Sequence, residues 1–323
     1  HNSMPGMTVW LADLRAEEIG GVVLDVSGTF LLSGSEVSGN VASAPILAHQ
    51  GPGELTLNHT ALWGNVVAGG GPLISLEADA QLTNVLIGGN LVLDDGALLQ
   101  WQPDPAVAWP SLLIERSELS RNALLGAGTV PGSSEIPRSN FLPGPNDHCL
   151  PPASGLLPFR NRSLPTSTAP LGTGALLELL VGPTSSGAAQ VEVSKSFLVE
   201  TQGGIGAALI RSSGQFDDLT VALLNTLIDD SGAPPSGGQI PIFIGQGGSP
   251  GGFARLLSSR NVLLGDPEIV LGPAFSHAEV SLDLVEVDPG GWVASAQTAT
   301  GIAGPPAPPQ DLSTAFLSEL AVD

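Results

Sequence analysis

The segment Leu55-Thr56-Leu57-Asn58-His59-Thr60-Ala61-Leu62-Trp63-Gly64-Asn65 recurs in altered form along the chain. Residues 80–90 (AQLTNVLIGGN) repeat it 25 residues later, and residues 30–40 (FLLSGSEVSGN) have the same form 25 residues earlier. Residues 112–122 carry a further copy. Self-similarity with a period of about 20 to 50 residues is typical of repeat architectures, so this segment decides how the rest of the sequence is interpreted.

We number the repeat from its final Asn, which is position 0, and extend the frame to nine copies. The residues at position 0 are Glu17, Asn40, Asn65, Asn90, Asn122, Thr201, Asp230, Asp266 and Asp288. Position −3 is aliphatic in all nine copies: Leu14, Val37, Leu62, Ile87, Leu119, Leu198, Leu227, Leu263 and Val285. Positions −8 and −10 are mostly apolar, and position −5 is mostly small and polar or acidic.

This pattern predicts short strands joined by bends. Apolar positions two residues apart form the inward face of a strand, because side chains alternate with period 2. The alternation breaks between positions −8 and −5, which predicts a bend onto a second short strand. The Gly-Asn ending is turn chemistry, since both residues tolerate left-handed backbone angles. Stacked copies would place equal positions about 4.8 Å apart, so Asn40, Asn65, Asn90 and Asn122 are expected to form an amide ladder.

With these repeats the chain resembles the right-handed parallel β-helix proteins of the pectate-lyase-like superfamily. In particular it is similar to repeats of bacterial surface and secreted proteins of the form L-x-L-x-x-S/T-x-Φ-x-G-N. The resemblance covers residues 5 to 295, with a break between 123 and 175. It implies an all-β fold, a single right-handed parallel β-helix of about nine to eleven coils, but no particular activity. A leucine-rich repeat is the alternative solenoid, although its coils lack the Gly-Asn ending.

The repeat frame also divides the chain. We expect residues 1–4 to be a cloning remnant, 5–300 to form the β-helix, and 301–323 to form a Pro-rich linker and a short capping helix. Within the β-helix, about 126–174 is expected to be a long loop excursion, with one poorly matched coil near residues 175–181. Asp311 is the expected helix N-cap. The helix is interpreted as a lid on the last coil, with a partner-binding helix as the alternative.

Composition excludes several classes of function. The chain has 31 acidic and 10 basic residues, a net charge of −21. Scattered arginines cannot provide the basic patch that nucleic acid or an anionic membrane surface requires. No apolar run approaches the ~18 residues of a membrane span, and the lone Cys149 allows no internal disulfide. The acidic surface favours a secreted or cell-surface protein or calcium binding, although it is also expected from a GC-rich genome or a salty habitat.

A metal site is the most specific prediction. Asp230, Asp266 and Asp288 share position 0 in this alignment, with Asp229 beside the first, so their carboxylates would stack along one edge. Stacked like charges are costly unless a cation or a proton neutralises them, and oxygen ligands suit calcium. The alternative is a row of solvated turn residues. No other cofactor is indicated.

No catalytic residues can be assigned from the sequence. A lyase of the pectate-lyase type would need a base such as Lys195, Arg211, Arg255 or Arg260, whose repeat positions do not coincide. Asn225 to Asp230 only faintly resembles a polygalacturonase motif, and Cys149 has no assignable partner. We therefore expect a non-catalytic structural or carbohydrate-facing binding domain, whose partner is a polysaccharide or cell-surface component. The alternative is a polysaccharide lyase or glycoside hydrolase acting in a groove along the β-helix.

Overall fold

The structure is a computed structural model that describes residues 8–17, 24–103, 110–127, 171–181, 188–199, 201–204, 207–214 and 218–229. Beyond residue 229 it describes the backbone of eight further strands between Phe243 and Asp311. All the described regular structure is β-strand, and every strand pair except the last one is parallel.

The strands form four sheets, which we call A to D. Sheet A contains β1 (Thr8–Ala12), β4 (Thr29–Ser33), β8 (Leu55–Asn58), β12 (Ala80–Thr83), β16 (Ser111–Glu115), β20 (Ala188–Ser194), β23 (Asp218–Leu224), β26 (Phe253–Ser259) and β29 (His277–Asp283). Sheet B contains β2 (Arg15–Glu17), β5 (Glu36–Ser38), β9 (Ala61–Trp63), β13 (Leu86–Gly88), β17 (Glu118–Ser120), β21 (Phe197–Val199), β24 (Leu227–Asp229), β27 (Val262–Leu264) and β30 (Glu286–Val287).

Sheets C and D complete each turn of the chain. Sheet C is short: β6 (Val41–Ala42), β10 (Val66–Val67), β14 (Leu91–Val92) and β18 (Ala123–Leu124). Sheet D contains β3 (Leu24–Ser27), β7 (Leu47–Gln50), β11 (Ile74–Leu76), β15 (Ala97–Trp101), β19 (Ala175–Val181), β22 (Ala208–Gly214), β25 (Phe243–Gly245), β28 (Glu268–Leu271), β31 (Val293–Ala296) and the antiparallel β32 (Gln310–Asp311).

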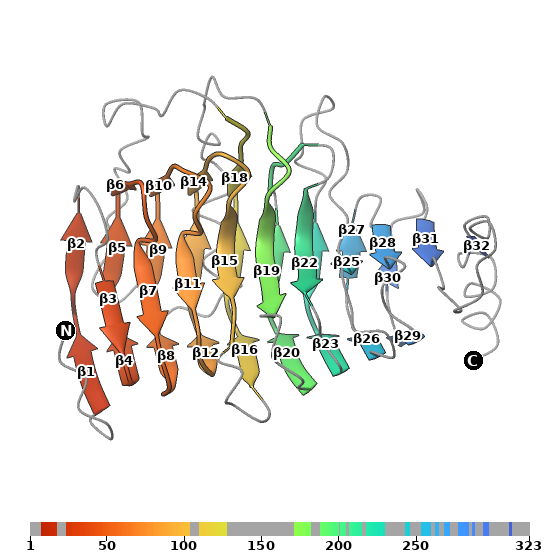
Figure 1. Ribbon diagram of the computed structural model, residues 1–323, viewed down its shortest axis with the longest axis horizontal. Helices are drawn as coiled ribbons and strands as arrows, with labels where there is room; N and C mark the ends of the chain where they lie inside the picture. Colours follow the sequence, from red (N-terminus) through yellow and green to blue (C-terminus); the bar gives the residue numbers. More distant parts are fainter. Residues whose placement is uncertain are drawn as a thin grey trace.

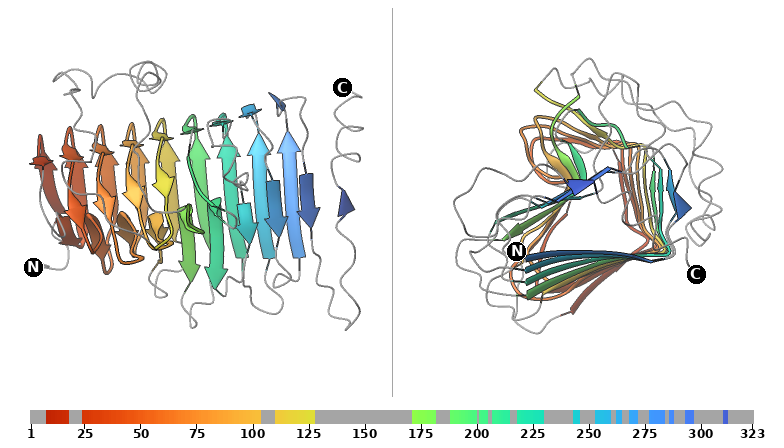
Figure 2. Two further views of the ribbon diagram at one scale, coloured as in Figure 1. Left: turned by 90° about the horizontal axis from the view of Figure 1, so that it is seen from above. Right: turned by 90° about the vertical axis from the view of Figure 1, so that its right-hand side faces the viewer.

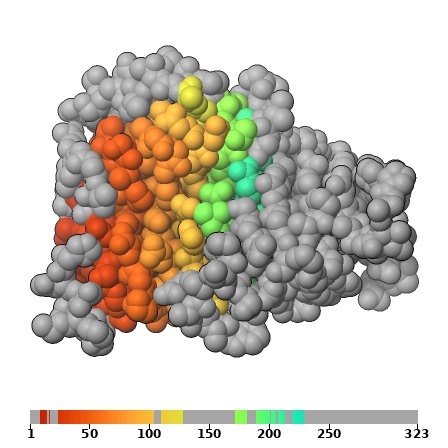
Figure 3. All heavy atoms as spheres, viewed as in Figure 1, coloured from red at the N-terminus to blue at the C-terminus, as the bar shows by residue number. Residues whose placement is uncertain are grey.

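Successive coils stack along one axis. Each strand pairs with its counterpart one coil away, so the strands run from β1 at the N-terminal end to β31 in chain order (Figure 1). Seen along the axis, the sheets enclose a common interior (Figure 2). On the face seen in Figure 3, the described coils pack side by side. Sheets A and B have nine strands each, which confirms the predicted parallel β-helix of nine to eleven coils.

The interior is a continuous apolar core made of the predicted columns. Leu62, Ile87 and Leu119 are Cα partners in β9, β13 and β17, and their exposed fractions are 0%, 0% and 1%. Sheets A and D contribute similar stacks, among them Leu57, Leu82 and Ile114. A second, smaller cluster lies on the outer side of sheet C, around Val66 and Leu91. The hydrophobic repeat therefore sets which residues are inside.

The predicted amide ladder is present at the corner between sheets B and C. The Nδ2 groups of Asn40, Asn65 and Asn90 each donate to the Oδ1 of the next Asn, at 2.9, 3.0 and 3.0 Å. The backbone N–H of each donates to the same oxygen, and each Nδ2 also donates to a carbonyl of the preceding coil. All four Asn side chains are fully buried. The left-handed residue of this turn is position −1 alone, as Gly64 shows with φ 64°.

A second ladder lies at the bend between sheets A and B. The hydroxyls of Ser35, Thr60, Ser117, Ser196 and Thr226 each donate to a carbonyl two residues earlier. The Oγ of Ser117 also accepts from the N–H of Val85 in the neighbouring coil, at 3.1 Å. This hydroxyl column is why position −5 is small and polar. It holds the bend that the broken alternation predicted.

Three copies of the repeat were aligned wrongly from the sequence. Val37 pairs with Ala16 and not with Leu14, Leu198 pairs with Ile228 and not with Leu227, and Leu263 pairs with Val287 and not with Val285. In the second case Thr226 supplies the hydroxyl of the bend, and Asn225 takes the left-handed angle that Lys195 has one coil earlier. The acidic residues chosen as position 0 do not determine how the coils align. A turn residue can move by one or two positions along the sequence, whereas the core residues and the hydroxyl column must stay in register with the next coil.

The long excursion begins and ends at a defined place. Leu125 forms an isolated antiparallel bridge with Leu171, and the N–H of Gly172 donates to the carbonyl of Leu124 at 2.9 Å. The extra coil expected near residues 175–181 is absent, because β16 pairs directly with β20 and β17 with β21. Residues 175–181 form β19, the sheet D strand that completes the coil of β16 and pairs with β15 and β22. Residues 128–170, the remnant at 1–4 and the predicted helix after Asp311 lie outside the described residues, whereas Asp311 itself is in β32.

Replacing a ladder amide should destabilise the fold strongly. Asn65→Leu removes an acceptor of two donors and a donor to Val37 and Asn90, and each buried group left unsatisfied costs about 1–3 kcal/mol. We expect a loss of at least ~3 kcal/mol in unfolding free energy, measured by urea denaturation. Asn58→Leu, at an outward and partly exposed position, is the matched control and should change stability little. Equal effects of the two variants would contradict the role of the ladder.

The ladder should also be extendable. Position 0 of the next coil is Thr201, which is 2% exposed and whose Oγ1 has no hydrogen-bond partner. Thr201→Asn would place an amide next to Asn122 in the arrangement that the preceding coils use. We expect a gain of about 1 kcal/mol, observed as a higher melting temperature. Thr201→Val, which removes the hydroxyl without adding an amide, is the control; a gain no greater than that of the Val variant would refute the extension.

Candidate functional site

The outer face of sheet A carries two straight rows of residues. The outer row consists of successive Cα partners: Trp10, Leu31, Thr56, Gln81, Leu113 and Glu192. The inner row, two residues further along each strand, consists of Ala12, Ser33, Asn58, Thr83, Glu115 and Ser194. Both rows alternate with buried core residues, so they face away from the core. Trp10 is 68% exposed, the most exposed large apolar side chain that the structure describes.

A third row follows at the bend between sheets A and B. We call it the corner row: Asp13, Gly34, His59, Asn84, Arg116, Lys195 and Asn225. Every member has a positive φ, between 50° and 59°. Gly and Asn adopt this conformation readily, whereas larger L-residues do so at a cost of about 1–2 kcal/mol each. Arg116 and Lys195 therefore occupy positions where Asn or Gly would be less strained.

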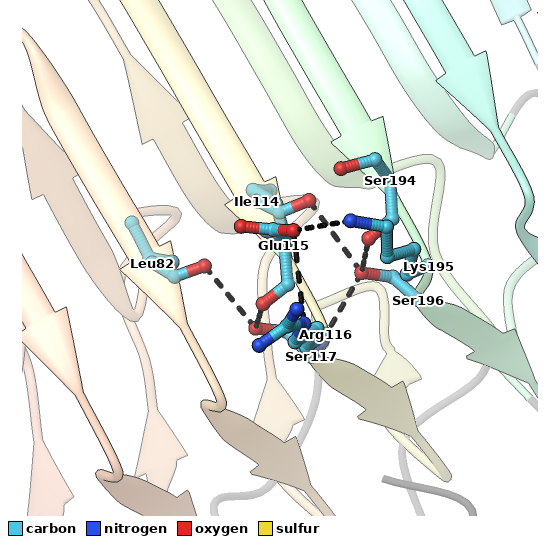
Figure 4. Close-up of polar contacts among 8 residues, drawn as sticks. All are labelled: Leu82, Ile114, Glu115, Arg116, Ser117, Ser194, Lys195 and Ser196. Atoms are coloured by element: carbon cyan, nitrogen blue, oxygen red, sulfur yellow. Dashed lines mark hydrogen bonds and ion pairs between the residues drawn. The ribbon is translucent and has the colours of Figure 1, made fainter. Parts of the chain in front are cut away.

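Arg116 and Lys195 meet at one carboxylate (Figure 4). Lys195 Nζ donates to Glu115 Oε1 at 2.8 Å, and Arg116 Nε lies 3.7 Å from the same oxygen. The hydrogen bond from Lys195 lowers the pKa of Glu115 below its ordinary value, against a smaller opposing effect of burial and with help from both positive charges. The Glu115 carboxylate therefore stays ionised at neutral pH. Arg116 and Lys195 side chains are 56% and 52% exposed.

A separate polar cluster lies on the outer face of sheet D. Glu178 of β19 is the Cα partner of Gln100 and of Arg211. Burial raises the pKa of Glu178 above its ordinary value, and the positive charge of Arg211 opposes the rise. Arg211 Nη2 also donates to the carbonyl of Thr173, whose N–H donates to Asp95 Oδ1 at 2.6 Å. This cluster places Arg211, one of the arginines considered as a lyase base, beside Glu178, and Asp95 is linked to it through the backbone of Thr173.

Several carboxylates stabilise turns. Glu77, Asp79, Asp94 and Asp95 each accept a backbone N–H from a neighbouring coil, at 3.1, 2.7, 2.7 and 2.6 Å. Hydrogen bonds to an ionised acceptor are short and strong. These acidic residues thus have a structural role between coils.

The predicted calcium ligands are not brought together by any described contact. Asp229 ends β24, where its Cα partners are Val199 and Leu264. Asp230, Asp266 and Asp288 lie outside the described residues, as does Cys149, and the strand register around them differs by one and two residues from the alignment that put them in one column. The calcium site stays a prediction. Among the residues that the structure describes, no group of three His, Cys, Asp or Glu could hold a metal.

Sequence reasoning missed the corner row and Trp10. A signal for the corner row was present, because a basic residue directly precedes the hydroxyl column in His59-Thr60, Arg116-Ser117 and Lys195-Ser196. The first coil was aligned two residues out of register, which kept Trp10 on the outward face but put it level with Ser33 instead of Leu31.

Comparison with known proteins adds little. No protein-family model matches the chain, and no curated protein matches it. The chain is similar to the crystal structure of HetL, a pentapeptide repeat protein involved in heterocyst differentiation regulation from the cyanobacterium Nostoc sp. strain PCC 7120. The match has 12% identity and covers 90% of this chain and 92% of HetL, but its TM-score is 0.20, too low to support an argument. The described part of the chain contains no helix that could cross a membrane.

Proposed function

We propose that this protein is a non-catalytic binding domain of a secreted or cell-surface protein, and that it binds an extended polysaccharide along the outer face of sheet A. Membership of the pectate-lyase-like superfamily is part of the same proposal. The observation that carries it is Trp10, whose indole is 68% exposed at the start of the outer row. An exposed aromatic side chain offers an apolar face to a sugar ring, and its N–H can meet a hydroxyl.

The rows beside Trp10 supply hydrogen-bonding groups at a regular interval. Thr56 and Gln81 continue the outer row, and Asn58 and Thr83 run parallel to them. Neighbouring coils are about 4.8 Å apart, a distance comparable to the length of one sugar unit in an extended chain. A polysaccharide laid along the axis would thus meet a pair of polar side chains at β8 and at β12, whereas β4 and β16 offer one polar residue beside Leu31 and Leu113. A flat face also needs no deep pocket, which suits binding of a long polymer.

The exposed position of Trp10 makes the test clean. Binding of soluble dextran, xylan and β-glucan is measured by the change in tryptophan fluorescence and by affinity electrophoresis. We expect at least one polymer to bind, and Trp10→Ala to weaken it about two- to tenfold through loss of stacking. Trp10→Phe should retain most of the affinity.

Leu11→Ala is the matched control. Leu11 is 36% exposed in the first coil, but it follows Trp10 on the same strand and so points to the opposite face, where its Cα partner is the buried Leu32. This substitution should leave affinity unchanged. Binding of none of the three polymers, or equal affinity of Trp10→Ala and the wild type, would overturn the proposal.

The second candidate function is a polysaccharide lyase or glycoside hydrolase, and the Glu178–Arg211 cluster is the observation that favours it. A carboxyl with a raised pKa beside an arginine suits proton transfer. Glycosidases, however, use two carboxylates that flank the scissile bond, and Asp95 is joined to this cluster only through the backbone of Thr173. If this function holds, incubation with the protein should produce new reducing ends or absorbance at 235 nm from the polymers, and Glu178→Gln should abolish this activity. If no polymer is cleaved, the enzymatic function is wrong and the binding function remains.

A further inference from the structure

The corner row contains a local excess of positive charge on a strongly acidic chain. Of the basic side chains that the structure describes, Arg116 and Lys195 are the exposed ones, whereas His49 and Arg121 are buried and His59 and Arg211 are partly buried. Arg116 and Lys195 occupy equivalent positions in neighbouring coils, one residue after the Cα partners Glu115 and Ser194. With Glu115 between them, two positive charges face one negative charge.

The backbone at these two residues is in a conformation that does not suit them. Their φ angles are 51° and 50°, while Asn84 and Asn225 occupy the same corner position at 54° and 52°. Asn tolerates this conformation better than Arg or Lys. Strained residues that persist where an easier residue is available point to a role for the side chain itself.

The orientation of the side chains is also fixed. Lys195 Nζ is held 2.8 Å from Glu115 Oε1, and the hydroxyls of Ser117 and Ser196 lock the bend beneath it, with Ser117 N–H donating to Ser196 Oγ at 3.1 Å (Figure 4). Both basic groups therefore lie beside one carboxylate at the edge of the proposed polysaccharide-binding face.

From these observations we infer that Arg116 and Lys195 form a site for an anionic group, a carboxylate or a sulfate, carried by the bound polysaccharide. This inference rests on the proposed function and adds the class of ligand. The net charge of −21 repels a polyanion from most of the surface. Arg116 and Lys195 would attract an acidic polymer locally, at this corner. The negative charge of Glu115 repels an anionic ligand, so the affinity of the site for the anionic group should be moderate.

The test compares dextran, carboxymethyl dextran and dextran sulfate. These polymers share one sugar backbone and differ in their charged groups, so the comparison isolates the effect of charge on binding. At low ionic strength, the wild type should bind the two anionic polymers more tightly than dextran. Arg116→Asn and Lys195→Asn should each weaken binding of the anionic polymers about two- to fivefold, with no effect on dextran. The difference should vanish at high salt, because exposed charges are screened.

Asn is chosen because it already fits this corner at positions 84 and 225, so both variants should keep or raise the melting temperature. Glu115→Gln is the opposite test: it removes the competing charge and should tighten binding of the anionic polymers. Inorganic sulfate should not compete at equal charge concentration, because a single free anion lacks the contacts of the sugar backbone.

The outcomes separate the two proposals. Binding of dextran with no preference for its anionic forms, or anionic binding unchanged in Arg116→Asn and Lys195→Asn, would overturn the anion site and leave polysaccharide binding standing. Weaker binding of all three polymers by Trp10→Ala, together with a reduced preference for the anionic polymers in Arg116→Asn and Lys195→Asn, would support both. No binding of any polymer by the wild type would overturn the proposed function itself.

Discussion

The fold depends on one constraint: a polar group buried at a corner of the coil must find its partner in the next coil. At the corner between sheets B and C, Asn65 meets this requirement by accepting from Asn40 and donating to Asn90, while its remaining N–H reaches the carbonyl of Val37. Each amide is satisfied only when the coils are stacked in register. The apolar columns drive collapse, but they would tolerate sliding; the ladder allows one alignment.

The hydroxyl column complements the amide ladder at the other bend. Ser117 satisfies a carbonyl of its own coil and the N–H of Val85 in the coil before. Outside the core, carboxylates such as Asp94 and Asp95 accept N–H groups across the turns. The chain thus needs few aromatic residues and no disulfide, because the polar groups of each coil are paired with those of its neighbours.

The sequence predicted the fold wherever burial constrains a position. Leu62, Ile87 and Leu119 and the four ladder Asn residues were all identified from the repeat, because a buried position admits few residue types. The extra coil expected near residues 175–181 was wrong, since those residues only complete the coil of β16. The copies ending at Glu17, Asp230 and Asp288 were misaligned by one or two residues, since an acidic turn residue is a poor marker of register.

The candidate site was harder to predict, because exposed positions are not restricted in this way. Arg116 and Lys195 share a position in the repeat, but only the backbone angles reveal that the position is strained and that both side chains meet Glu115. The misaligned first coil left Trp10 on the outward face but level with Ser33, and its pairing with β4 moves it to the row of Leu31. Surface chemistry on a solenoid therefore follows from the register, and the register follows from the buried ladders.

The most direct test of the ladder is hydrogen exchange of the Asn side-chain amides, followed by NMR on the ¹⁵N-labelled protein. If the amides bridge the coils, the Nδ2 protons of Asn65 and Asn90 should exchange far more slowly than those of Asn58 and Asn84, which are partly exposed. Exchange of all four side chains at similar rates would contradict the account, because the coils would then be held by the apolar columns alone.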